Sequence, residues 1–179
     1  LLGNKTAVDV KVNNIDKVAP KIEIKNSETG PTNKTVTVTI TADEKIKAVN
    51  GWTLGNDQKS LKKTYSTNSS ETIAISDLVG NITQAKIVVN NIDKVSPKVT
   101  IEYSTLEPTN QNVTVKITSN KEIQQVDGWN LDNTKKILTK EYQSNQEEKI
   151  IIRDLAQNEI EANIKISNID KTKPEAEIK

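Results

Sequence analysis

The sequence predicts an all-β protein made of two tandem β-sandwiches of about 77 residues each. The stretch Asn-Ile-Asp-Lys-x-x-Pro begins at Asn14, Asn91 and Asn168, so the chain repeats with a period of 77 residues. Short runs within each period alternate β-branched and polar residues, as strands with one buried face do. No segment has the apolar spacing of a helix over a window of ~11 residues.

The repeated stretch sets the predicted domain boundaries. Residues 1–17 are expected to form the last strand of a preceding, truncated repeat and a joint. Residues 18–94 and 95–171 form the first and second repeats, and residues 172–179 form the first strand of a following, truncated repeat. A lone last strand at 1–14 has unpaired edges. We therefore expect it to be held by a neighbouring molecule or by the cut strand at 174–179, or to extend away.

The alternation places the strands within each repeat. The first contains Ile22 and Ile24, and the second is the Thr-Val-Thr-Val-Thr-Ile run at 35–40, matched at 112–117. β-Branched residues on one face and polar residues on the other are typical of an antiparallel sheet with one solvated side. Further strands are expected at three groups of apolar residues: Leu61 and Tyr65; Ile73 and Ile75; and Ala85, Ile87 and Val89.

The middle of each repeat breaks its own alternation. Trp52 has the opposite parity to Val49, so an extra residue has to be absorbed between them. We place a bulge or tight bend at Asn50-Gly51, and at Asp127-Gly128 in the second repeat. The single tryptophan of each repeat then follows the 35–40 strand, which is the central buried position of an immunoglobulin-like sandwich.

The residues Asp77-Leu-Val-Gly-Asn81 are expected to form a hairpin turn. Asp77, like Asp154 in the second repeat, is expected to cap this turn. Because Gln157 replaces Gly80 in the second repeat, we expect no positive φ at that position. We assign this conformation instead to the asparagine that follows it.

Composition excludes several classes of function. The 25 basic and 24 acidic residues give a formal net charge of +1, without the clustered positive field that nucleic acid or an anionic membrane requires. Without Cys or His, the chain has no disulfide, structural zinc site, thiol nucleophile or Ser-His triad. No apolar run approaches the ~18–20 residues needed for membrane insertion. The lack of Cys fits a bacterial exported protein with an extracellular location.

Four features together resemble the tandem bacterial Ig-like repeats of Gram-positive cell-surface and cell-wall-associated modular proteins. They are the joint stretch, the 35–40 strand, the run Asn50-Gly-Trp-Thr-Leu54 and the hairpin turn at 77–81, and the resemblance covers essentially the whole chain. It implies a structural spacer or stalk in a surface or secreted protein, where adjacent repeats of the same chain are the partners. The alternative is an adhesin-like module that binds cell-wall or host glycan, or a protein, since some members of the family bind sugars, calcium or proteins.

No catalysis is expected from the chain itself, although it could belong to a larger modular enzyme. A pair of catalytic carboxylates would lie in a cleft and occur once. Each carboxylate that stands out here is either duplicated at a structural turn or lost in the second repeat.

Aromatic residues are the candidates for ligand binding. Trp52 and Trp129 could stack against a sugar ring, and Tyr65 and Tyr142 could assist. The competing interpretation places both tryptophans in the core and both tyrosines beside them with the hydroxyl at the rim.

The joint aspartates Asp16, Asp93 and Asp170 are the candidates for calcium, which would be the only cofactor. Calcium takes six to eight oxygen ligands, so several carboxylates have to converge. In the second repeat Asp43 and Glu44 are replaced by Asn120 and Lys121. The competing interpretation is that each joint aspartate caps a turn by accepting backbone N–H groups.

Overall fold

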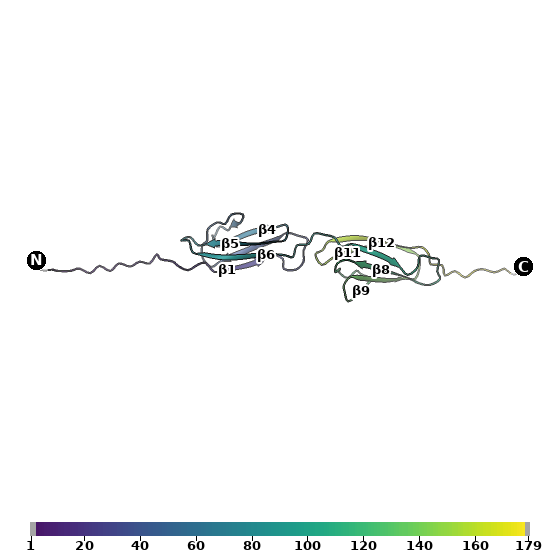
Figure 1. Ribbon diagram of the computed structural model, residues 1–179. Helices are drawn as coiled ribbons and strands as arrows, with labels where there is room; N and C mark the ends of the chain where they lie inside the picture. Colours follow the sequence, from purple (N-terminus) through teal and green to yellow (C-terminus); the bar gives the residue numbers. More distant parts are fainter. Residues whose placement is uncertain (1–2, 178–179) are drawn as a thin grey trace. The chain divides into compact units, whose positions relative to one another are not determined.

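The computed structural model describes residues 3–177, which form an all-β protein of two β-sandwich repeats without a helix (Figure 1). Within that range no helix is long and apolar enough to cross a membrane. The first repeat contains β1 (Ile22–Asn26), β2 (Val36–Ala42), β3 (Thr53–Leu54), β4 (Ser60–Tyr65), β5 (Ser69–Ser76) and β6 (Ile82–Val89). The second contains β7 (Val99–Tyr103), β8 (Val113–Ser119), β9 (Asn130–Leu131), β10 (Ile137–Tyr142), β11 (Gln146–Arg153) and β12 (Glu159–Ile166).

Each repeat pairs a four-stranded antiparallel sheet with a two-stranded hairpin. The sheets have the orders β1-β2-β4-β3 and β7-β8-β10-β9, and the hairpins are β5-β6 and β11-β12. Every strand of the second repeat begins 77 residues after its counterpart. The registers agree as well, with Ile24 opposite Ile40 in the first repeat and Ile101 opposite Ile117 in the second.

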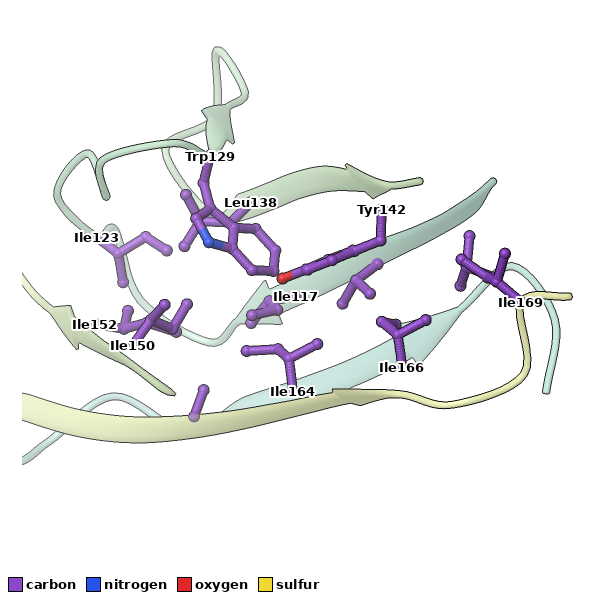
Figure 2. Packing of buried hydrophobic residues seen from close by; sticks show 13 residues of the cluster. Ile117, Ile123, Trp129, Leu138, Tyr142, Ile150, Ile152, Ile164, Ile166 and Ile169 are labelled. Carbon is purple, nitrogen blue, oxygen red and sulfur yellow. The ribbon is translucent and has the colours of Figure 1, made fainter. Parts of the chain in front are cut away.

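The cores follow the predicted alternation. Val36, Val38 and Ile40 of β2 are fully buried, whereas the threonines between them are only half-buried. Figure 2 shows the core of the second repeat, where Trp129 and Tyr142 face isoleucines of the opposing hairpin such as Ile164. Burial of one face of β2 and β6 and of their counterparts β8 and β12 removes apolar side chains from water and stabilises the repeats. The first strand departs from the predicted alternation, since β1 contains no buried residue and Ile24 is 37% exposed.

The predicted bend before each tryptophan is a tight turn. The Trp52 N–H donates to Val49 O at 3.0 Å, and Gly51 has a φ of 76°. Since φ is positive at Gly51 and not at Asn50, the turn has the backbone of type II. It reverses the side-chain parity, so Trp52 points into the core.

Contacts divide the chain into two compact units. One holds most residues before Asn90, and the other holds the rest together with Glu28–Val36 and Ser66–Asn68. Those two segments group with the later residues because they bind the backbone that leaves β6, as described next.

The backbone after β6 is fastened by a set of hydrogen bonds that we call the exit clasp, formed by Thr32, Asn68 and residues 91–93. Thr32 N–H donates to Asn91 O, and Asp93 N–H donates to Thr32 O, both at 2.9 Å, which gives a parallel bridge. The Asn68 side chain accepts from Ile92 N–H at 2.8 Å and donates to Ile92 O at 3.0 Å. The asparagine amide thus pairs with a backbone peptide as a neighbouring strand would.

The second repeat contains the same exit clasp. Thr109 bridges Asn168 and Asp170 with two backbone bonds of 2.8 Å. The Asn145 side chain bonds both the N–H and the carbonyl of Ile169, at 2.8 and 2.9 Å. The clasp is therefore a property of the repeat and occurs at both exits.

Residues 3–20 and 171–177 form no strand. Val8, Val10 and Val12 are 79%, 81% and 62% exposed, although they alternate with polar residues as a strand does. An alternating pattern does not form a strand without a partner for its backbone groups. Residues 3–14 and 174–177 therefore do not form the strands predicted for them. The remaining residues of those two predictions, 1–2 and 178–179, lie outside the described part of the chain.

Candidate functional site

The hairpin turn of the first repeat is built around a buried carboxylate. Asp77 Oδ1 accepts from the backbone N–H groups of Val79, Gly80 and Asn81 at 3.0, 2.5 and 2.8 Å. Its Oδ2 accepts from the Asn81 side chain at 2.7 Å. Burial opposes ionisation of Asp77, yet the Asn81 side chain and these N–H groups hold its pKa below the ordinary value. The prediction that Asp77 caps the turn is confirmed.

The expectation about positive φ in this turn is wrong. Gln157 has a φ of 70° and Gly80 a φ of 109°, whereas Asn81 and Asn158 have no positive φ. The carboxylate cap fixes the path of the turn, so whichever residue stands at this position has to adopt the left-handed conformation. Glycine does so without the clash between a Cβ and the backbone that other residues suffer.

Replacing Gln157 by Gly is expected to raise the free energy of unfolding of the second repeat by about 1 kcal/mol, because the strain of a side chain at positive φ disappears. The gain in stability would be measured by thermal unfolding, with hydrogen exchange of β11 and β12 as the probe of the second repeat. The matched control is Gly80→Gln, which should lower the stability of the first repeat. A loss of stability in Gln157→Gly would show that the glutamine side chain itself stabilises the turn.

Each joint aspartate caps a local turn. The N–H of the residue two positions on donates to Oδ1 of Asp16, Asp93 and Asp170, at 2.9, 3.0 and 2.9 Å. This contact is the Asx-turn that the sequence suggested. The Asx-turn occurs at all three joint aspartates, so it does not show which of them could bind calcium.

In the first repeat the joint aspartate also meets two other carboxylates. Single oxygens of Asp16, Glu44 and Asp77 all lie within 4.8 Å of one another. Asp77 is buried, Glu44 is half-buried and Asp16 is exposed. Partial burial and the negative charges of Asp16, Asp77 and Asp43 raise the pKa of Glu44. The site therefore concentrates negative charge.

In the second repeat a lysine occupies the position of Glu44. Lys121 Nζ lies 2.6 Å from Asp93 Oδ2, 3.4 Å from Asp154 Oδ2 and 2.5 Å from Val95 O. The hydrogen bond from Lys121 holds the pKa of Asp93 below its ordinary value, and the bond to Asp93 raises the pKa of Lys121. One ammonium group thus lies close to both carboxylates that correspond to Asp16 and Asp77, and it compensates one of their two negative charges.

This comparison separates the three calcium candidates. Asp93 is engaged by Lys121, and Asp170 accepts from the N–H and the hydroxyl of Thr172. Of the three joint aspartates, only Asp16 belongs to a group of three acidic side chains among residues 3–177 that could hold a metal ion. Calcium prefers carboxylate and carbonyl oxygens and accepts flexible geometry. Three carboxylates offer part of its ligand set.

Lys121 stands at the position of Glu44 in the second repeat, but nothing local in the sequence connects either residue with the hairpin caps Asp77 and Asp154. The detectable signal is that positions 16, 44 and 77 read Asp, Glu, Asp in one repeat, whereas positions 93, 121 and 154 read Asp, Lys, Asp in the other. A basic residue in place of one of three acidic residues indicates that the three positions lie close together and that the lysine offsets part of their negative charge.

The aromatic candidates lie in the two cores. Trp52 and Trp129 are 8% and 4% exposed, and Tyr65 and Tyr142 are 6% and 1% exposed. Each tryptophan meets the tyrosine of its repeat edge to face, with ring centroids 6.5 and 6.4 Å apart. None of the four presents a ring face to solvent on which a sugar could stack.

A charged pair that the sequence did not reveal covers these aromatic residues. Lys63 Nζ lies 2.7 Å from Glu71 Oε1 and 5.7 Å from the centroid of the Trp52 ring, within the range of a cation–π contact. The Tyr65 hydroxyl donates to Glu71. Hydrogen bonds from Lys63 and Tyr65 hold the pKa of Glu71 below its ordinary value.

The second repeat has the same arrangement, with Lys140 2.8 Å from Glu148 and the Tyr142 hydroxyl bonded to that carboxylate. In both repeats the lysine ammonium group lies over the rings of the tryptophan and the tyrosine. The repetition of this arrangement in both cores supports a structural role.

Comparison with known proteins gives no relative for this chain: no family model, no curated protein and no solved structure matches it.

Proposed function

We propose that the chain is a non-catalytic structural spacer in an exported bacterial protein, in which Ig-like repeats position another domain outside the cell. The observation that carries the proposal is the identity of the two repeats as structures. They share strand spacing, registers, hairpin caps and exit clasps. Repetition of a whole fold, with its exit fastened each time, favours a role in which length and spacing matter.

The chemistry of the described residues supports the same proposal. Many of their acidic side chains cap turns, form ion pairs with lysines, or belong to the group of Asp16, Glu44 and Asp77. The chain has neither His nor Cys, so it contains no His-activated serine and no thiol nucleophile. Nothing in the fold positively indicates catalysis.

The spacer proposal is tested by changing the number of repeats. A variant with residues 18–94 duplicated in tandem is compared with the 179-residue chain by small-angle X-ray scattering. We expect the maximum dimension to grow by one constant increment for each added repeat. A compact variant, whose maximum dimension does not grow, would contradict the proposal. The control is the same duplication carrying Trp52→Ala in the added copy, which should not form an ordered unit.

The second candidate function is calcium binding in the first repeat. The bound ion would stabilise the repeat or support adhesion by the exported protein. The observation that favours it is the contrast between Glu44 and Lys121. In one repeat an ammonium group forms ion pairs with both aspartates, whereas in the other a third carboxylate takes its place and no ion pair to Asp16, Glu44 or Asp77 is recorded among residues 3–177. A divalent cation would supply the missing charge, with solvent and backbone oxygens completing its ligands.

Calcium binding is tested by thermal unfolding in calcium and in EDTA, using single-tryptophan variants so that each repeat is observed alone. Trp129→Phe leaves Trp52 to report the first repeat, and Trp52→Phe leaves Trp129 to report the second. We expect calcium to raise the melting temperature of the first repeat only. The matched control, Glu44→Lys, should abolish the increase. An unchanged melting temperature of the first repeat in calcium and EDTA would eliminate this function and leave the spacer proposal untouched.

A further inference from the structure

The type II turn before the core tryptophan contains the one Asn-Gly pair of the sequence, Asn50-Gly51. Asn50 is exposed, and a Cβ placed on Gly51 would find no atom within 4 Å. The turn is closed by the bond from Trp52 N–H to Val49 O. Among the described residues, neither the Asn50 side chain nor the Gly51 N–H takes part in a recorded hydrogen bond.

This environment matches the requirements of a reaction between a side-chain amide and the next backbone nitrogen. The nitrogen has to be unhindered and free of a competing acceptor, and the amide carbon has to be accessible to water. Glycine offers the least hindered backbone nitrogen because it has no Cβ. The other asparagines that cap or pair, such as Asn68 and Asn81, have their amides engaged in hydrogen bonds.

We propose that Asn50 is a site of spontaneous deamidation that modifies the first repeat as the protein ages. The Gly51 nitrogen attacks Asn50 Cγ, a C–N bond forms, and the bond from Cγ to the side-chain nitrogen breaks. The Gly51 proton leaves with that nitrogen as ammonia, and a five-membered succinimide remains. Water then opens the ring at either carbonyl, which gives aspartate or isoaspartate at position 50.

The second repeat shows that the aspartate product fits the fold. Asp127 occupies the equivalent position, and its turn has the same closure, from Trp129 N–H to Val126 O at 3.2 Å, with a φ of 73° at Gly128. An acid in this turn therefore leaves the tryptophan in the core. The first repeat carries the amide that converts into the residue already present in the second.

The isoaspartate product is expected to behave differently. It routes the main chain through the former side chain, which adds one backbone atom immediately before Gly51 and Trp52. Trp52 is 8% exposed and packs edge to face with Tyr65, so a longer backbone displaces a ring that has little room to move. Ageing would therefore divide the molecules into a form with a stable first repeat and a form with a weakened one.

The conformation of the turn also determines the rate of deamidation. Ring closure needs the Gly51 nitrogen to approach Asn50 Cγ, and the folded turn holds the backbone in one conformation. A single backbone bond closes this turn, so it opens locally at a small fraction of the cost of global unfolding. We expect deamidation in the folded chain to be slower than in the unfolded chain, and still faster than at other asparagines.

The experiment incubates the full 179-residue chain at mildly alkaline pH and follows each asparagine by peptide mass spectrometry, with isoaspartate detected by enzymatic methylation. We expect Asn50 to convert several-fold faster than any other asparagine and to give both products. Asn50→Gln should remove the fast conversion. Asn50→Asp should unfold at the same temperature as the unaged protein, whereas the isoaspartate fraction should unfold earlier.

Conversion of Asn50 in the folded chain at the rate of the other asparagines would overturn the proposal. So would fast conversion that persists at another residue in Asn50→Gln. Asn50→Ser serves as a second blocking variant if the glutamine side chain disturbs the turn. None of these outcomes depends on whether the chain is a spacer.

Discussion

Replacing Trp129 by Ala is expected to lower the free energy of unfolding of the second repeat by about 3–5 kcal/mol, the range for removal of a buried aromatic side chain. Trp129 is 4% exposed and lies among fully buried residues such as Ile117 and Leu138 (Figure 2). A domain of this size has a total stability of roughly 4–12 kcal/mol at ~0.05–0.15 kcal/mol per residue. The substitution should therefore leave the second repeat largely unfolded at moderate temperature.

The measurement is hydrogen exchange of peptides from β8, β10 and β12, which should lose their protection. The fluorescence of Trp52, in the other repeat, is the internal control and should keep the emission of a buried indole. Trp129→Phe is the matched variant, expected to be less destabilising because it retains an aromatic ring against Tyr142. If β8 and β12 keep full protection from hydrogen exchange in Trp129→Ala, the tryptophan does not stabilise the core. That result would favour a role of Trp129 in ligand binding.

Reversing the charge of Lys121 by Lys121→Glu is expected to lower the free energy of unfolding of the second repeat by about 2–3 kcal/mol. Removal of one partner from a fully buried ion pair costs ~3–5 kcal/mol, and the smaller figure allows for solvent screening. The side chains of Lys121 and Asp93 are 25% and 41% exposed, whereas that of Asp154 is 3% exposed. The buried carboxylate of Asp154 would then face two other acids.

The reciprocal variant Glu44→Lys should stabilise the first repeat, because it places an ammonium group between Asp16 and Asp77. The stability of each variant is measured by thermal unfolding in a single-tryptophan background, so that the fluorescence reports one repeat at a time. The double swap should exchange the behaviour of the two repeats, including any response to calcium. Equal stability of Lys121→Glu and the unchanged protein would show that this pair is too well solvated to matter.

The stability conferred by removing Glu44 should depend on pH. The folded pKa of Glu44 is raised above 4.5, so the protonated form is favoured by folding. Its ionisation therefore weakens the first repeat as pH rises through the folded pKa, and this penalty is absent at pH values below 4.5. The advantage of Glu44→Gln over the unchanged protein should be present at neutral pH and vanish in acid.

The pair formed by Asp93 has the opposite dependence. Its folded pKa is lowered below 3.8, so its contribution is present above that value and is lost as pH falls through the folded pKa. Loss of the contact between Asp93 and Lys121 should therefore contribute to acid unfolding of the second repeat. Lys121→Ala should flatten the acid limb of the stability curve.

The strands were predictable from the sequence because their pattern is local. Val36, Val38 and Ile40 alternate with threonines, and burial follows that alternation residue by residue. The hairpin cap was predictable for the same reason, since Asp77 bonds backbone groups within four positions of itself. Local chemistry determines these features, so a single sequence contains them.

The candidate cation site was not predictable in the same way. Glu44 meets Asp16 and Asp77 only after the sheet and the hairpin have packed, because the three residues are distant in sequence. The covering contact of Lys63 and Glu71 likewise depends on the juxtaposition of β4 and β5. Periodicity says which face a residue occupies and does not say which distant side chain it will meet.

The exit clasp has a consequence for a protein held under tension. A pull on the chain beyond residue 93 reaches the bonds of Thr32 and Asn68 before it reaches β6. The bridge is parallel, so its two backbone bonds share the load and have to break together, and peeling one after the other is prevented. Forced unfolding is governed by the rate of the first rupture. Each repeat therefore carries its own mechanical lock at the point where the load leaves it.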